Sequence, residues 1–434
     1  MKTILNQADD ISRRRFVQGA ASTFLGVGML PATEALFSRS AFAAGENAST
    51  ARQIASAKRV IYLYMSGGMT HLDTFDVKPG AETQGPTKAI NTSADGVQIS
   101  EYLPRLAKHM HHGAIVNSLS SKTGAHQQAN YLMHTSYEMR GTIKHPGMGA
   151  WMLKFLGQDN QTLPANVVIG GASRHPGAGF FESRFGPVMI GDPTKGLQNV
   201  TTRVAKDDFS YRLGLSQKLG EKFREEYGRK DVRAYTSMYD DAVKLMESPD
   251  LNAFDIAKEP EAVRKEYGDD RFGQGCLLAR RLVESGVRFV EVGLGGWDTH
   301  QANFVRAPER CDILDRGISA LAADLERRGL LSDTLIVVAS EFGRTPRINQ
   351  NVGRDHYPKA FTGLLLGGGI AGGQKYGKTD ETGENVIENP VDAADFNATI
   401  GYALGLPLNQ VLYSPSKRPF TVAQNGKPLT QLFA

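Results

Sequence analysis

Cysteine is scarce in this 434-residue sequence, which has only Cys276 and Cys311. Two thiols cannot form a disulfide framework or a Cys-based zinc cluster. An excess of charge of one sign is also missing, because 50 Lys and Arg face 46 Asp and Glu, a formal net charge of +4. Dedicated nucleic-acid-binding proteins normally carry a strong basic excess. We therefore expect no nucleic-acid partner.

A long apolar run is the next feature that the sequence lacks. The moderately apolar stretch at residues 16–30 is shorter and less apolar than the roughly 20 residues that a membrane span needs. We therefore expect no stable membrane span. The composition is otherwise that of an ordinary globular protein, with 41% hydrophobic and 22% charged residues. A chain with this much apolar side chain can bury a core, which excludes a disordered protein.

The N-terminal 43 residues have the pattern of an export signal. Arg13, Arg14 and Arg15 precede the apolar stretch, and Ala41-Phe42-Ala43 supplies a small-x-small cleavage site. Residues 1–43 are thus predicted to be a twin-arginine signal peptide that engages the twin-arginine (Tat) export machinery. The protein would then be periplasmic or secreted. An amphipathic N-terminal helix with a chance arginine cluster is the alternative.

Strand and helix patterns alternate along the rest of the chain. Helical patterns of ten or more residues separate the strand-like runs, which indicates βαβ units. We predict an α/β fold with a mostly parallel central sheet and helices on both faces. Residues 44–434 are predicted to form one domain, with a charged helical insertion at about 201–260. Predicted strands cover residues 59–65, 114–116, 166–169, 287–292, 334–339 and 361–366, and predicted helices 126–139, 261–284, 311–328 and 393–404.

Histidines and carboxylates follow several of the predicted strands. Ligands bind at the carboxyl ends of the strands in open parallel sheets, so these side chains are candidates for one site. Imidazole and carboxylate together suit zinc, manganese or iron, and the nitrogens make calcium or magnesium less favourable. Any one such pair is more often a solvated loop, but three at equivalent strand ends predict a metal site. The candidate ligands are His71, Asp73, Asp298, His300, Glu341, Asp355 and His356.

Arg344 and Arg354 lie beside these candidate ligands in the sequence. A guanidinium group can hold an anionic substrate group bidentately, and ordinary loop salt bridges are the alternative. We therefore list both arginines as candidate substrate-binding residues.

Five segments carry a resemblance to a known family. They read MSGGMTHLDTFDVKP, SLSSKTGAHQQANYLMHT, GGWDTH, SEFGRTPRI and GRDHYP, and the resemblance as a whole extends from residue 60 to about residue 405. In these segments the chain resembles the secreted DUF1501 family, which belongs with the alkaline phosphatase/sulfatase-like superfamily. The resemblance implies an alkaline phosphatase-like fold and one or two divalent metal ions.

The resemblance also implies roles for individual residues. Asp298 and His300 resemble the superfamily's Asp and His pair, Glu341 stands where an Asp followed by His is common, and Asp355-His356 resembles the later His. The superfamily's acidic ligand after the first strand is absent from residues 66–68. His71 or Asp73 would have to replace it.

The superfamily nucleophile is a Ser, Thr or modified Cys near a helix start. Ser121 and Thr123 precede the predicted helix at 126–139 and are therefore candidate nucleophiles. Either hydroxyl can instead cap the helix. His126 can be a ligand, an acid/base or a hydrogen-bonding residue at the helix start. The sulfatase pattern Cys-x-Pro-x-Arg is missing, which argues against a formylglycine sulfatase.

These observations favour an exported metal-dependent hydrolase of phosphate or sulfate esters or a related anionic group, carried on a small molecule or a polymer. The competing hypothesis is a metal-binding protein of the same fold without turnover, which binds or assembles outside the cytoplasm. A metal-free serine hydrolase is disfavoured, because no G-x-S-x-G occurs. Residues 372–379 fit the P-loop pattern, but residues 380–390 have no apolar helical face, so we predict a glycine-rich loop without nucleotide.

Overall fold

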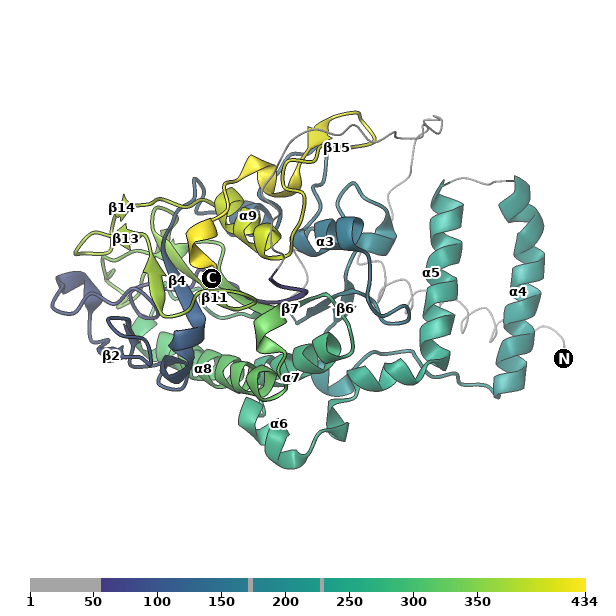
Figure 1. Cartoon of the computed structure of the whole chain (residues 1–434), viewed down its shortest axis with the longest axis horizontal. Coiled ribbons are helices and arrows are strands. Elements are labelled where there is room, and N and C mark those ends of the chain that lie inside the picture. The colour runs from purple at the N-terminus through teal and green to yellow at the C-terminus, as the bar shows by residue number, and fades with distance from the viewer. Residues whose placement is uncertain (1–55, 171–174, 227–229) are drawn as a thin grey trace.

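The computed structural model describes residues 56–170, 175–226 and 230–434, so the predicted signal peptide lies outside the described residues. An eight-stranded sheet forms the centre of this part of the chain (Figure 1). In spatial order its strands are β12 (Gln374–Tyr376), β4 (Gly113–Leu119), β11 (Phe361–Gly367), β8 (Thr334–Ala339), β1 (Arg59–Met65), β7 (Phe289–Leu294), β5 (Asn166–Ile169) and β6 (Val188–Ile190).

The sheet is mostly parallel. β1 runs parallel to β7 and β8 on its two sides, and β5 runs parallel to β6 and β7. β11 is antiparallel to both of its neighbours, β4 and β8. The predicted α/β class with a mostly parallel sheet is therefore confirmed.

β1 shows why the apolar runs become central strands. Side chains alternate between the two faces of a strand, and a strand buried on both faces reads as a continuous apolar run. Ile61, Leu63 and Met65 belong to the core on one face of the sheet, and Tyr62 and Tyr64 to the core on the other. Two tyrosines in the second core bring hydroxyl groups into this layer, next to the buried His134.

Helices cover both faces. α7 and α8 pack on the side of the first core, and α2, α3 and α9 lie on the side of the second (Figure 1). The helices are α2 (His126–Thr135), α3 (Met148–Leu156), α4 (Lys206–Glu226), α5 (Lys230–Glu247), α6 (Glu261–Tyr267), α7 (Arg271–Glu284), α8 (Asn303–Arg327) and α9 (Ala393–Ala403). Among the described residues, no helix is long and apolar enough to cross a membrane.

Local chemistry explains where the helices differ from the predictions. The predicted helix at 261–284 divides into α6 and α7, because Gly268 ends the first with φ of 88° and Asp270 caps the second by accepting from the N–H groups of Phe272 and Gly273. α2 ends at Thr135, since Ser136 takes a left-handed conformation with φ of 65°. The segment predicted as an insertion contains α4 and α5, which stand at the outer end of the molecule beyond β6 (Figure 1).

Four short ladders complete the fold and lie outside the main sheet. They pair β2 (Ala89–Asn91) with β3 (Gln98–Ser100), β9 (Gly343–Arg344) with β10 (His356–Tyr357), β13 (Lys378–Thr379) with β14 (Val386–Glu388), and β15 (Leu412–Tyr413) with β16 (Pro419–Phe420). The ladder of β9 and β10 positions residues of the candidate site.

Candidate metal centre

The carboxyl ends of three adjacent parallel strands build the base of the site. β1, β7 and β8 end side by side, so the loops that follow them bring Gly67, Asp298 and Glu341 together. Gly67 has φ of 118°, and a Cβ atom there would lie 2.6 Å from the backbone nitrogen of Asp298. Only glycine fits this close approach without strain. The glycine after β1 therefore lets the Asp298 loop lie against the first strand.

A two-residue ladder brings the last histidine to the same place. β10 pairs with β9 so that His356 lies opposite Arg344. The backbone N–H of Arg354 donates to the carbonyl of Thr299 at 3.0 Å, which ties the loop before β10 to the loop after β7. His300 and His356 are thereby held next to each other, although 55 residues separate them in the chain.

Three histidines at this edge share one arrangement, in which the Nδ1 atom of each ring is tied to an oxygen. His126 Nδ1 lies 2.8 Å from Glu341 Oε1, His356 Nδ1 lies 2.8 Å from the carbonyl of Gly124, and His300 Nδ1 lies 2.7 Å from Asp355 Oδ1. Carbonyl and carboxylate oxygens only accept, so each Nδ1 carries the proton and donates it. In each neutral ring Nε2 is then left as an acceptor with a free lone pair.

These Nε2 atoms converge on one carboxylate. His356 Nε2 and His300 Nε2 each lie 3.2 Å from Asp298 Oδ1 and 3.0 Å from each other, and His126 Nε2 lies 3.5 Å from Asp298 Oδ2. His126 Nε2 is buried and has no hydrogen-bond partner in the described part of the chain. A shared proton could lie between only one pair of these atoms, whereas a metal ion could bind all of them. His126, Asp298 and His356 thus form a group that can hold a metal ion.

Arg344 fixes the carboxylate in this position. Its side chain is buried and donates to Asp298 Oδ1, to the carbonyls of Gly67 and Gly68, and to the carbonyl of Arg354 at 3.1 Å. Burial by itself raises the pKa of Asp298, but the hydrogen bond and charge of Arg344 outweigh it and lower that pKa to about 2. Asp298 is therefore ionised at neutral pH.

Two predicted ligands hold histidines instead of facing the centre. Glu341 is buried and accepts from His126 Nδ1, from the N–H of Gly67 at 2.9 Å and from the hydroxyl of Tyr64 at 3.1 Å. Asp355 accepts from His300. Carboxylates commonly hold metal-binding histidines in this way, and that Glu341 and Asp355 are themselves ligands stays a prediction.

His71, Asp73 and Arg354 have their contacts outside this cluster, and the roles expected of them from the sequence stay predictions. His71 Nε2 contacts the carbonyl of Gly383 at 2.9 Å, and Asp73 pairs with Arg354 at 3.0 Å. Asp73 also accepts from the hydroxyls of Thr70 and Thr87. Arg354 has no exposed side-chain surface and gives its remaining N–H groups to backbone carbonyls. Its geometry is that of a buried structural ion pair, which leaves nothing for a substrate.

The loop before α2 lies beside the metal-binding group. Gly124 accepts from His356, and the N–H of Ser121 donates to the carbonyl of Pro358 at 2.7 Å. The N-cap of α2 is Ala125, whose side chain makes no capping hydrogen bond, so neither Ser121 nor Thr123 caps the helix. The half-buried Thr123 hydroxyl accepts from the N–H of Ala125 at 3.3 Å. Backbone N–H groups at the start of α2 are thereby left without a side-chain acceptor.

A second histidine and carboxylate group was not predicted from the sequence. Glu291 of β7 lies 3.2 Å from His134 Nε2 and 3.4 Å from His175 Nε2, beneath α2. His134 Nδ1 donates to the carbonyl of Asn130, whereas His175 Nδ1 accepts from the N–H of Gly177 at 3.0 Å. The proton of His175 is therefore on Nε2 and points to Glu291. We interpret this group as a buried ion pair, because that ring has no lone pair facing the carboxylate.

Together, the α/β sheet and the site define a protein with a histidine and aspartate centre at the carboxyl edge of its strands. Residues 57–433 match the family described as "Protein of unknown function (DUF1501)", so the chain belongs to that family. A comparison with curated proteins gives no match.

Several solved structures are similar over most of the chain. The lipoteichoic acid synthase LtaP from Listeria monocytogenes is 10% identical, with 82% of this chain and 74% of that chain covered and a TM-score of 0.41. The PsFucS1 sulfatase from Pseudoalteromonas sp. is 14% identical, with 87% and 72% covered and a TM-score of 0.38. A protein in the alkaline phosphatase superfamily from Vibrio parahaemolyticus is 12% identical, with 87% and 71% covered and a TM-score of 0.37. Similarities this distant assign no activity.

Proposed function

We propose that the chain is an exported metal-dependent hydrolase of phosphate or sulfate esters, or of a related anionic group. One observation carries the proposal, namely the convergence of three imidazole Nε2 atoms on the Asp298 carboxylate. Each ring is held by an outer oxygen, which is the usual construction around metal-binding histidines. The proposed substrate is a small molecule or a polymer that carries such an anionic group.

The donor set fits a single zinc or manganese ion better than calcium or magnesium, because imidazole nitrogens outnumber carboxylate oxygens. His126, Asp298, His300 and His356 would hold it. A second ion would need a further free carboxylate, but Glu341 already accepts three hydrogen bonds, and the Arg344 guanidinium already lies against Asp298. A bound ion of this kind supplies Lewis acidity and lowers the pKa of a bound water or hydroxyl.

The residues around the centre suit an anionic substrate. The N-terminus of α2 has no side-chain cap, and backbone N–H groups at such a position bind phosphate or sulfate oxygens well. Thr123 and Ser121 lie in the loop that leads into this helix and are the proposed nucleophiles. Arg344 acts through Asp298, which it keeps ionised and in place.

A metal-binding protein without turnover is the second candidate. The observation that favours it is the burial of Arg344 and Arg354, which use their N–H groups inside the protein and leave none for a substrate. Binding or assembly outside the cytoplasm would need the metal group and the fold, but no catalytic hydroxyl.

A panel of aryl phosphate, sulfate and phosphonate monoesters separates the two candidates. With the zinc- or manganese-loaded protein, we expect turnover of at least one ester and a loss of 100-fold or more in kcat for Thr123→Ala or Ser121→Ala, with metal content unchanged. Ser216→Ala, an exposed hydroxyl on α4, is the matched control and should keep full activity. Absence of turnover across the panel would favour the binding protein.

Export is proposed from residues 1–43 and needs its own test. Replacing Arg13 and Arg14 by Lys should hold the protein in the cytoplasm, because the twin-arginine pathway requires that pair. Normal export of the variant, measured by cell fractionation, would contradict the assignment.

A further inference from the structure

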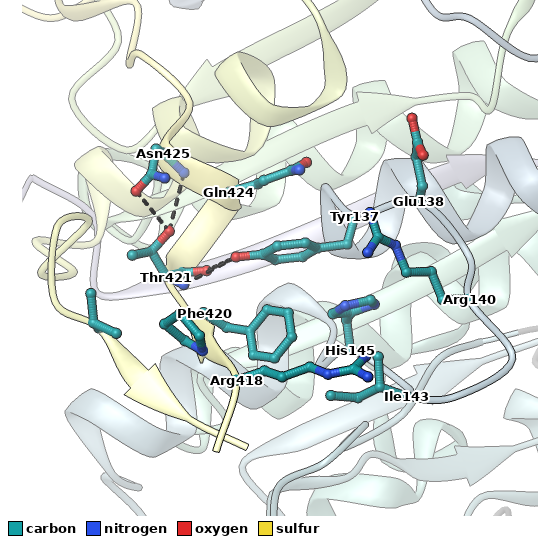
Figure 2. A pocket seen from close by; sticks show the side chains of 12 residues that line it. Tyr137, Glu138, Arg140, Ile143, His145, Arg418, Phe420, Thr421, Gln424 and Asn425 are labelled. Atoms are coloured by element: carbon teal, nitrogen blue, oxygen red, sulfur yellow. Dashed lines mark hydrogen bonds between the residues drawn. The ribbon is translucent and has the colours of Figure 1, made fainter. Parts of the chain in front are cut away.

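A pocket of about 540 Å³, shown in Figure 2, is lined by residues that follow the C-terminal end of α2, the end away from the metal centre. The centre holds His126 at the first residue of α2, whereas the pocket begins at Tyr137, just past the last. The nine helical steps between His126 and Thr135 separate the two by roughly 14 Å, at 1.5 Å per residue. The pocket is therefore a different place from the candidate metal centre.

Three aromatic rings form one wall of the pocket. Tyr137 stacks on His145 with ring centroids 4.4 Å apart, and Phe420 meets both rings edge to face. The Tyr137 hydroxyl donates to the carbonyl of Thr421 at 2.8 Å and accepts from the Thr421 N–H at 3.0 Å, as Figure 2 shows. This wall is fixed by hydrogen bonds as well as by packing.

His145 presents an N–H donor that the protein does not use. The ring is 98% buried, and its Nδ1 lies 2.8 Å from the hydroxyl of Tyr131, which already accepts from the His145 backbone N–H. Among the described residues, Nδ1 is the only acceptor that this hydroxyl reaches, so the hydroxyl donates to Nδ1 and Nε2 carries the ring proton. Burial and nearby Arg140 lower the pKa of His145 to about 4, so the ring is neutral at pH 7. No described residue accepts from Nε2.

Two arginines add positive charge to the lining. Arg140 lies next to the aromatic wall, and Arg418 reaches the hydroxyl of Thr142 at 3.2 Å with one of its N–H groups. Both are exposed, and Glu138 is the only acidic residue of the lining. Among the described residues, no partner takes the remaining N–H groups of either guanidinium ion. The lining therefore has more donors than acceptors and a net positive charge.

The chain that follows Phe420 has an unusual backbone conformation. Ala423, Gln424 and Asn425 have φ of 53°, 50° and 61°, three successive non-glycine residues in the left-handed region. Such residues are strained, and they persist where surrounding contacts hold them, often at ligand-binding sites. Thr421 holds them here, since its hydroxyl donates to Asn425 Oδ1 and accepts from the Asn425 N–H (Figure 2).

We infer that this pocket binds an oxyanion, a phosphate or sulfate group that is free or carried on a sugar, between Arg140, Arg418 and the Nε2–H of His145. Charge-assisted hydrogen bonds from two guanidinium groups and a buried neutral donor suit such a group. Phe420 lines the pocket and is half-buried, so its accessible part provides apolar surface for a sugar ring. The inference does not depend on hydrolysis at the metal centre.

Binding of inorganic phosphate and sulfate, measured by isothermal titration calorimetry, tests the inference. All variants are made in a His356→Ala background, so that binding at the metal centre is not counted. We expect Arg140→Ala/Arg418→Ala to weaken binding at least 10-fold. The control Arg203→Ala/Lys218→Ala removes the same charge from exposed positions elsewhere and should bind as before. The proposal would be overturned if the two double variants bound the anions equally, whether both kept the affinity of the His356→Ala background or both lost it to the same extent.

His145→Phe tests the neutral donor separately, because phenylalanine keeps the stacking on Tyr137 and removes the N–H group. We expect a loss of 3-fold or more for both anions, and unchanged binding would remove His145 from the site. Hexose 6-phosphate and hexose 6-sulfate distinguish the two ligand sources. Tighter binding than the inorganic ions indicates a sugar-borne group, and equal binding indicates a free oxyanion. The exposed arginine variants keep the test valid even if His145→Phe fails to fold.

Discussion

His300 and His356 face each other through their Nε2 atoms at a distance of 3.0 Å, and neither ring has a proton there when it is neutral. Asp355 and the carbonyl of Gly124 hold the ring protons on the far side of each imidazole. Two lone pairs at this distance repel unless a positive charge lies between them. The Asp298 carboxylate beside them adds negative charge, so this group could hold a metal ion.

Asp355→Asn is expected to weaken metal binding without unfolding the protein. Asp355 is half-exposed and touches His300, so the variant loosens the orientation of one ligand and removes none. Changes of this kind cost roughly 10- to 100-fold in metal affinity. Competition with a chromophoric chelator measures the effect. Asp312→Asn, an exposed acid paired with Arg316, is the control and should keep wild-type affinity.

Arg354→Ala is expected to destabilise the fold and not merely raise KM. Asp73 and Arg354 are both fully buried, and removal of one partner leaves an unpaired buried charge. Breaking such a pair costs about 3–5 kcal/mol of unfolding free energy. Denaturant unfolding measures it. A variant of normal stability that binds substrate weakly would instead support the role expected from the sequence.

The Glu291 and His134 pair should give the stability a pH dependence of its own. Burial alone raises the pKa of Glu291 and lowers that of His134, but their mutual attraction reverses both, so the pKa of Glu291 is lowered and that of His134 is raised. The lowered carboxylate contributes stability above its unfolded pKa of about 4.5 and loses it as pH falls below that value. The raised imidazole contributes below about 6.5 and loses its contribution as pH rises through its folded pKa.

The difference in unfolding free energy between wild type and His134→Gln should therefore be largest between about pH 4.5 and 6.5 and shrink toward pH 9. Thermal or denaturant unfolding at a series of pH values measures this difference. A difference that grows with pH would show that His134 is neutral in the folded protein.

Lys378→Ala should change little, although Lys378 occupies the lysine position of the P-loop pattern. The structure places this residue exposed on β13, and β13 follows β12 with no helix between them. We expect the unfolding free energy to stay within about 0.5 kcal/mol of wild type, as for most surface substitutions. A large loss of stability or activity would contradict the prediction that residues 372–379 form a glycine-rich loop without nucleotide.

The central strands were predictable because burial on both faces makes them continuous apolar runs. Residues 59–65, 166–169 and 334–339 match β1, β5 and β8 to the residue. β6 and β12 were missed, since each has only three residues and β12, Gln374–Tyr376, is a polar edge strand inside the glycine-rich segment. Such short strands are stabilised by pairing with the neighbouring strands, and they have no sequence pattern of their own.

The sequence predicts which residues lie near the candidate site, but it does not predict which side chains contact each other there. The strand-end rule brings Asp298 and Glu341 to one edge, as expected. That Glu341 orients His126, or that Asp73 binds Arg354 from 281 positions away, depends on side-chain packing that no spacing encodes. The position of Tyr64 gave a weak indication of these contacts, because its place in the apolar run puts a hydroxyl group on a buried face of the sheet.

Metal content of the purified protein tests the central claim most directly. Protein refilled with zinc or manganese, dialysed and analysed by inductively coupled plasma mass spectrometry should hold about one ion per chain. His300→Ala and His356→Ala should hold much less and remain folded, because the centre lies at the rim of a sheet that has its own core. The control Asp312→Asn should match the wild type. Wild-type protein that holds no more metal than His356→Ala would contradict the account.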